Sequence, residues 1–96
     1  MVYNQDEIQG VLHSEALNNW TIANASIYRK IKFSDFKEAL KAMNSIGEEA
    51  EKMNHHPDWR NVYNTLEITL STHDEGGVTT KDIELAKKID EILLNF

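Results

Sequence analysis

Three histidines carry most of the chemistry that this sequence offers. His55 and His56 are adjacent, and His73 follows at a distance that a strand hairpin can bridge. An imidazole has an unperturbed pKa of about 6.5, so near neutral pH it can donate or accept a proton with little driving force. A cleft that held all three rings would therefore suit general acid–base catalysis.

A hairpin is predicted between the histidine pair and the third histidine. Apolar and polar residues alternate over residues 66–72, and residues 59–63 also have strand character. Asn64 and Thr65 are the expected two-residue connection between them. Such a turn fixes which residues of the two strands face each other.

The predicted pairing brings the histidines together. It places His56 opposite His73 on neighbouring strands, where facing Cβ atoms lie about 5 Å apart. Glu51 lies four residues before His55, on the same helical face if a helix extends that far. A carboxylate there would favour the protonated ring and fix its tautomer. A solvated helix face explains Glu51 equally well.

A metal site is the main alternative interpretation of these residues. Three histidines and a carboxylate are suitable ligands for zinc or iron. Adjacent residues in an extended chain point to opposite sides, which disfavours ligation of one ion by both His55 and His56. We therefore predict no metal. Isolated, satisfied histidines near strand ends are the other alternative, and the convergence of three such rings with an acid argues against it.

The first part of the chain predicts a helix followed by a hairpin. An N-cap pattern begins at Asn4, and a helix is expected over about residues 5–13. Strands are expected over residues 20–23 and 26–33, with a turn at residues 24–25. Histidine 13 lies on the first helix and is given no role.

A long amphipathic helix is expected next. Apolar residues recur at three- and four-residue steps from Phe36 to Met53, with Ser34 as the expected cap. Pro57 cannot continue this helix. In the strand before it, Arg29 interrupts the apolar face, so one end of that face is expected to be wet or paired.

The last part of the chain predicts a loop and a third helix. Gly76 and Gly77 form the loop, and Thr79 with Asp82 resembles a capping box. Asp82 is interpreted as a cap partner in preference to a catalytic acid. The element order α-β-β-α-β-β-α indicates an α+β fold, a four-stranded antiparallel sheet with three helices packed on one face.

Bulk composition narrows the classes of function. The 96 residues predict a single domain over residues 1–96, and 41% hydrophobic residues suffice for a core. Ten basic against sixteen acidic residues give a net charge of -6, which disfavours direct contact with nucleic acid or an anionic membrane. The chain has no cysteine, no signal-peptide pattern and no apolar run of membrane-spanning length, so we expect a cytoplasmic protein.

The run from Glu51 to Trp59, with its His-His-Pro core, resembles the signature of the pterin-4a-carbinolamine dehydratase family. The match continues through Asn61, Val62, Tyr63, Asn64, Leu66, Ile68, Leu70, Ser71, Thr72 and His73, and through the spacing of Gly77, Thr79 and Asp82. It is strongest over residues 50–83. Upstream, Trp20 and residues 33–36 look like family positions in a more variable half.

The resemblance implies a homodimer or homotetramer with the fold above. It implies dehydration of a 4a-hydroxytetrahydropterin to a quinonoid dihydropterin without cofactor or metal, as in tetrahydrobiopterin recycling. Some family members also bind transcription factors as dimerisation partners in animals. A binding module of that kind, or a pterin-binding protein of another pathway such as molybdopterin metabolism, is the alternative function.

The resemblance also suggests roles for individual residues. His55 and His73 would be the acid–base pair, His56 would bind and orient the pterin, and Glu51 would support His55. The pterin edge would meet groups around Pro57, Thr72, His73, Asp74 and Glu75. Trp20 or Trp59 would offer apolar surface to the ring, although both fit a core or lid position better.

Overall fold

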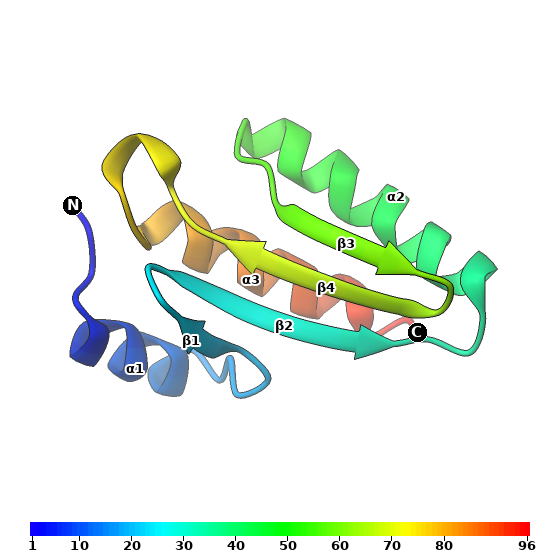
Figure 1. The fold of residues 1–96 in the computed structure, drawn as a ribbon, viewed down its shortest axis with the longest axis horizontal. Helices are drawn as coiled ribbons and strands as arrows, with labels where there is room; N and C mark the ends of the chain where they lie inside the picture. The colour runs from blue at the N-terminus through cyan, green and yellow to red at the C-terminus, as the bar shows by residue number, and fades with distance from the viewer.

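A computed structural model describes residues 1–96 as a four-stranded antiparallel sheet with three helices on one face (Figure 1). The strands are β1 (Thr21–Ala23), β2 (Ser26–Lys32), β3 (Asp58–Val62) and β4 (Thr65–Leu70), in the spatial order β1-β2-β4-β3. The helices are α1 (Gln5–Ser14), α2 (Phe36–Met53) and α3 (Thr80–Leu93), and a single 3-10 turn, His73–Glu75, joins β4 to α3. The predicted element order and α+β class are confirmed.

Apolar residues on the two central strands decide which face the helices cover. Ile27 of β2 and Leu66 and Ile68 of β4 are fully buried on that face. Helix α2 packs there through the buried residues Ala39, Ala42, Ile46 and Ala50, and α3 through Ile83, Leu85, Ala86 and Ile89. Each fully buried Leu or Ile side chain contributes about 1.5–3 kcal/mol. None of the helices has the length and apolarity needed to cross a membrane.

The start of α2 differs from the prediction by one residue. Asp35, not Ser34, is the N-cap, and its side chain accepts a hydrogen bond of 2.8 Å from the backbone N–H of Glu38. A carboxylate satisfies this free N–H and also interacts favourably with the positive end of the helix dipole. The prediction of Ser34 as the cap was therefore wrong, whereas the helix itself is confirmed.

The predicted turn of the second hairpin was also wrong. The connection consists of Tyr63 and Asn64, and Val62 pairs with Thr65. Asn64 is held from outside the hairpin, because the backbone N–H of Phe33 donates to its carbonyl at 2.7 Å and its side-chain amide donates to the Phe33 carbonyl at 3.0 Å. These two long-range hydrogen bonds fix the position of the turn. Tyr63 adopts a positive φ of 51° to close it.

The changed register removes the predicted strand pairing of two histidines. Strand β3 begins at Asp58 and β4 ends at Leu70, so His56 and His73 both lie outside the ladder. They still approach each other, through the loops that leave the same end of the hairpin. Their proximity therefore depends on the ends of α2 and β4, not on a cross-strand pair.

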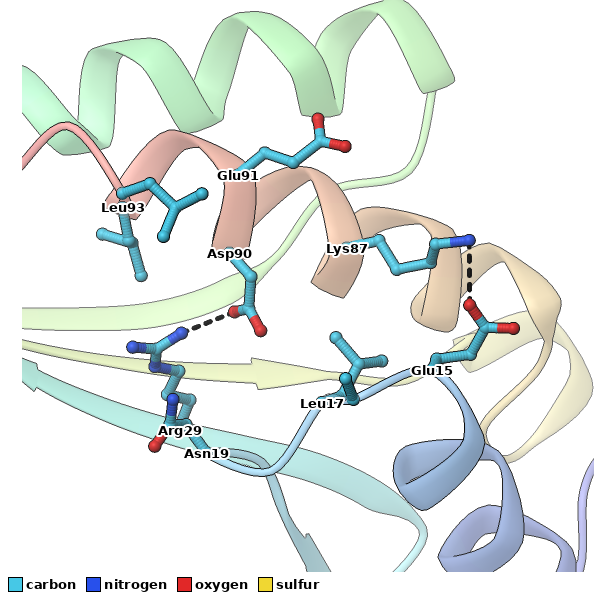
Figure 2. A pocket seen from close by; sticks show the side chains of 10 residues that line it. Glu15, Leu17, Asn19, Arg29, Lys87, Asp90, Glu91 and Leu93 are labelled. Carbon is cyan, nitrogen blue, oxygen red and sulfur yellow. Dashed lines mark hydrogen bonds and ion pairs between the residues drawn. The ribbon is translucent and has the colours of Figure 1, made fainter.

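Arg29 is paired, as its position on the buried face of β2 requires. Its Nη1 donates to Asp90 Oδ1 of α3 at 2.5 Å, and the same oxygen accepts the indole N–H of Trp20 at 2.9 Å. The pair borders a groove of about 410 Å³ between α3 and the segment after α1 (Figure 2). Figure 2 also shows the ion pair between Lys87 and Glu15 at 3.1 Å across the groove. The groove's cations are thus already neutralised by neighbouring carboxylates.

Candidate functional site

The three predicted histidines line one polar cleft of about 280 Å³. The cleft lies where the end of α2, the end of β4 and the start of α3 meet. Its walls carry no apolar side chain and consist of Asn54, His55, His56, Ser71, Thr72, His73, Asp74 and Lys81. Such a surface can hydrogen-bond to a small polar ring system and exchange protons with it.

The end of α2 directs the two adjacent histidines to different surroundings. Asn54 closes the helix in the left-handed conformation, with φ 51° and ψ 42°. The backbone N–H of His55 then donates to the carbonyl of Ala50 at 3.0 Å, which draws this residue under the helix end. His55 is buried, whereas the side chain of His56 is 60% exposed.

His55 is held by a buried carboxylate from a distant part of the chain. Its Nε2 lies 2.6 Å from Oδ1 of Asp82, which is completely buried. Because a carboxylate oxygen accepts hydrogen bonds, this contact places a proton on Nε2 and fixes the tautomer of the ring. His55 is consequently the most rigidly oriented of the three rings.

Asp82 has a second task at the start of α3. Its Oδ2 accepts from the Thr79 backbone N–H and from the Thr72 hydroxyl, both at 2.9 Å, and the two threonine hydroxyls lie 2.7 Å apart. The predicted capping box is confirmed. The interpretation of Asp82 as a cap partner alone was too narrow, because the carboxylate serves the helix with one oxygen and His55 with the other.

Glu51 does not support His55, and this part of the prediction was wrong. Its Oε1 lies 2.8 Å from Nε2 of His56, and both side chains are largely exposed. Glu51 pairs with His56 and not with His55 because of the left-handed conformation of Asn54. That conformation turns His55 inward at the helix end and leaves His56 on the side of α2 where Glu51 projects. The pair sits at the rim of the cleft, in water.

His73 differs from both other histidines. It lies in the exposed 3-10 turn His73–Glu75, and no hydrogen bond joins its ring to another side chain. Both ring nitrogens are thus available to a bound molecule. The cleft combines a buried, oriented imidazole with an exposed, unengaged one.

Four of the predicted binding residues do not line the cleft. Trp20 is buried beside Asp90 of α3, and Trp59 of β3 is half-buried against α2, where its ring lies about 4.0 Å from the Cβ position of Gly47. A contact between Trp20 and a ligand in the histidine cleft is excluded by this placement. Pro57 is also absent from the lining, and Glu75 instead binds the Met1 amine at 3.0 Å.

Three lining residues were missed by sequence reasoning. Asn54 immediately precedes His55, and Lys81 immediately precedes its buried partner Asp82. Ser71 immediately precedes Thr72. Their neighbours in sequence carried the signal, but polar residues beside a predicted site are too common to be singled out. No group of three or more His, Asp or Glu side chains is placed to hold a metal ion.

Comparison with known proteins places the chain among related sequences. A family model described as pterin 4 alpha carbinolamine dehydratase matches residues 1–92. A protein of Solibacter usitatus, provisionally named a pterin-4-alpha-carbinolamine dehydratase, is 47% identical over 88 residues, which are 92% of this chain and 90% of the relative. A protein of Christiangramia forsetii with the same provisional name is 48% identical over 89 residues, covering 93% and 90% of the two chains.

The fold has a close match among solved structures. The crystal structure of a transcriptional coactivator/pterin dehydratase from Brucella melitensis superimposes with a TM-score of 0.89 at 38% identity. The alignment covers 96% of this chain and 98% of that one. The similarity therefore extends over the whole arrangement of sheet, helices and cleft-forming loops.

Proposed function

The chain belongs to the pterin 4 alpha carbinolamine dehydratase family, and we propose that it dehydrates a 4a-hydroxytetrahydropterin by acid–base catalysis in the histidine cleft. The family and the names of the relatives support the dehydratase activity itself. The observation that carries the proposed mechanism is the pairing of two unlike imidazoles in one polar cleft, His55 bound to buried Asp82 and His73 free.

The reaction is an elimination that needs one acid and one base. The bond between C4a and the hydroxyl oxygen breaks, and the oxygen leaves as water after it receives a proton. The N5 proton is lost, and its electron pair forms the C4a–N5 double bond of the quinonoid product. No electron is gained or lost overall, so the elimination needs no redox cofactor. We propose that the imidazoles supply the acid and the base without a metal.

The surroundings of the three histidines suggest a division of roles. His55 and His73 form the proposed acid–base pair, one on each side of the C4a–N5 bond. His56, which Glu51 orients at the rim, binds and positions the pterin. Asn54, Ser71 and Lys81 are suited to meet polar groups at the pterin edge, in place of the tryptophans and Pro57.

Regeneration of tetrahydrobiopterin after aromatic amino acid hydroxylation is the setting in which the family's substrate is formed, and we propose it here on family grounds. The coactivator role in the name of the Brucella structure is said of that protein. No residue of the present chain favours it over dehydration. The cytoplasmic location stays a prediction from composition.

We also propose that the chain self-associates. Large apolar side chains remain exposed on α2, at Phe36 and Leu40, and next to the β3–β4 turn, at Val62 and Tyr63. The turn lies beside the start of α2 (Figure 1), where Phe33 and Asn64 exchange two hydrogen bonds. Sedimentation of wild type and Leu40→Glu should show a smaller species for the variant, whereas a wild-type monomer contradicts this proposal.

The test of the dehydratase mechanism is a direct rate measurement. Dehydration of synthetic 4a-hydroxytetrahydropterin is followed by absorbance with wild type, His55→Ala, His73→Ala and His13→Ala. His13 is an exposed histidine on α1 outside the cleft and serves as the control. We expect at least ~100-fold loss for the cleft variants and a wild-type rate for the control, since positioned proton transfer contributes 10²–10⁴-fold. A nearly normal rate for His73→Ala contradicts the assignment.

A further inference from the structure

We propose that residues 1–3 form a strap that positions the loop carrying His73, and that Val2 packs this strap into the space left by the missing side chain of Gly77. This inference rests on the proposed function, since it concerns a ring of that reaction. Val2 and Gly77 are positioning residues in this view, because neither touches the cleft.

The loop between Thr72 and Gly77 is closed at its base, but few contacts hold its tip. Thr72 and Gly77 form an isolated antiparallel bridge, with the Thr72 N–H donating to the Gly77 carbonyl at 2.8 Å. Between them, the turn His73–Glu75 has no buried residue. A segment without buried apolar contacts belongs to the least stable parts of a structure. The position of His73 therefore depends on what holds the two limbs of the loop.

The N-terminal segment contacts the returning limb at two consecutive residues. The backbone N–H of Tyr3 donates to the carbonyl of buried Val78 at 2.9 Å. A Cβ atom placed on Gly77 would lie 2.6 Å from Cγ1 of Val2, closer than real Cβ contacts allow. Val2 thus packs directly on the Gly77 backbone. The Met1 amine also binds Glu75 within the loop, at 3.0 Å.

Small displacements of His73 would be costly for the proposed reaction. A shift of about 1 Å in a reacting group can lower a rate by as much as 10²-fold. Displacing the strap is consequently expected to slow proton transfer while leaving in place the binding contacts of Asn54, His56 and Lys81, which lie outside the loop. The effect should appear in kcat more than in KM.

Gly77→Ala is a suitable probe because the substitution is harmless apart from Val2. The φ of Gly77 lies outside the positive region, unlike that of Gly76 at 77°, so alanine fits its backbone. The collision involves Cγ1 of Val2, whereas the Val2 Cβ is 3.9 Å from the new atom, an ordinary contact. Val2→Ala should therefore relieve the collision. Gly10→Ala, with nothing within 4 Å, is the matched control.

The experiment compares wild type, Gly77→Ala, Val2→Ala, Val2→Ala/Gly77→Ala and Gly10→Ala. We expect Gly77→Ala to lower kcat about tenfold with KM within about twofold, and the double variant to recover most of that loss. Amide exchange at Glu75 and Gly76, whose N–H groups bond to the Thr72 carbonyl, should rise in Gly77→Ala and fall again in the double variant. Val2→Ala alone, which creates no collision, should give a smaller change in the same direction.

Two results would contradict the proposal that residues 1–3 position the loop. One is wild-type kcat and wild-type amide exchange in Gly77→Ala. The other is a double variant as impaired as Gly77→Ala, because the damage would then not pass through Val2. If the wild type itself fails to accelerate dehydration, the proposed function falls, yet the pattern of amide exchange still decides whether residues 1–3 hold the loop.

Discussion

Nε2 of His55 lies 2.6 Å from Oδ1 of Asp82, although 27 positions separate the two residues along the chain. The other oxygen of this carboxylate is bound by the Thr79 N–H and the Thr72 hydroxyl. One buried side chain therefore joins the end of α2, the end of β4 and the start of α3. The orientation of the proposed catalytic ring depends on this junction.

Asp82→Asn should damage both activity and stability. The amide replaces one acceptor oxygen with a donor, so either His55 or the two threonine partners must face an N–H group. A buried group left without a partner costs about 1–3 kcal/mol. We expect a loss of that size in the free energy of urea unfolding, together with a lower kcat. Unchanged stability with full activity would contradict the assigned role of Asp82.

Glu51→Gln should have a milder and different effect. The Glu51–His56 pair is exposed, and such pairs contribute about 0–1 kcal/mol. Because His56 is assigned to binding, we expect KM to rise by a few fold while kcat stays close to wild type. Steady-state kinetics checks this. A loss of kcat larger than that of Asp82→Asn would instead favour the original prediction that Glu51 supports a catalytic ring.

The pH dependence of stability should reveal the hydrogen bond between the Tyr28 hydroxyl and Glu67 at 2.7 Å. This bond lowers the pKa of Glu67 below 4.5, with help from Arg60, and raises the pKa of Tyr28 above 10.0. A lowered carboxyl pKa stabilises the fold above pH 4.5, and this is lost as pH falls through the folded value. A raised phenol pKa stabilises it below pH 10.0, and this is lost as pH rises through the folded value.

The comparison with Tyr28→Phe isolates this contribution. The difference in unfolding free energy between wild type and variant should be constant between about pH 6 and 9. It should shrink in acid, where Glu67 is protonated, and in alkali, where Tyr28 ionises. Urea titrations across a pH series measure the difference. A difference that does not vary with pH would show that the bond is not formed in solution.

Asp90→Ala should weaken the fold without disabling the cleft. The change leaves Arg29 and the Trp20 N–H without their shared acceptor in a partly buried position. We expect a loss of about 1–3 kcal/mol in unfolding free energy. The groove of Figure 2 is lined by residues from the C-terminal half of α3, whereas Asp82 lies in the first turn of that helix. We therefore expect the dehydration rate of the folded variant to be within about twofold of wild type. A folded but inactive variant would contradict this and show that the groove and the histidine cleft are coupled.

Patterns that repeat along the chain predicted most of the fold. The apolar stripe from Phe36 to Met53 and the alternation along β2 and β4 were sufficient for element type and order. Arg29 was correctly expected to be wet or paired, because a charge on a buried strand face needs a partner. The identity of that partner, Asp90, could not be predicted, since the helix-to-strand contact is not encoded locally.

The errors concern positions that distant residues decide. The β3–β4 turn follows the bonds between Asn64 and Phe33, which no local turn preference contains. Glu51 pairs with His56 and not with His55 because Asn54 is left-handed. The φ of this one residue reverses the side to which each imidazole ring points. The histidine cluster survived these errors because both α2 and β4 still end at the same corner of the sheet.

The sheet has a helix-covered side and a bare one, and the bare side limits how this chain can assemble. Lys30 and Arg60 flank Glu67 there on neighbouring strands, in register on both sides. Covering this surface with an apolar partner would remove water from these charged groups. The cost in free energy would exceed the gain from apolar contact. Another protein surface meeting the bare side would therefore have to bring opposite charges of its own, and its hold would weaken as salt is added.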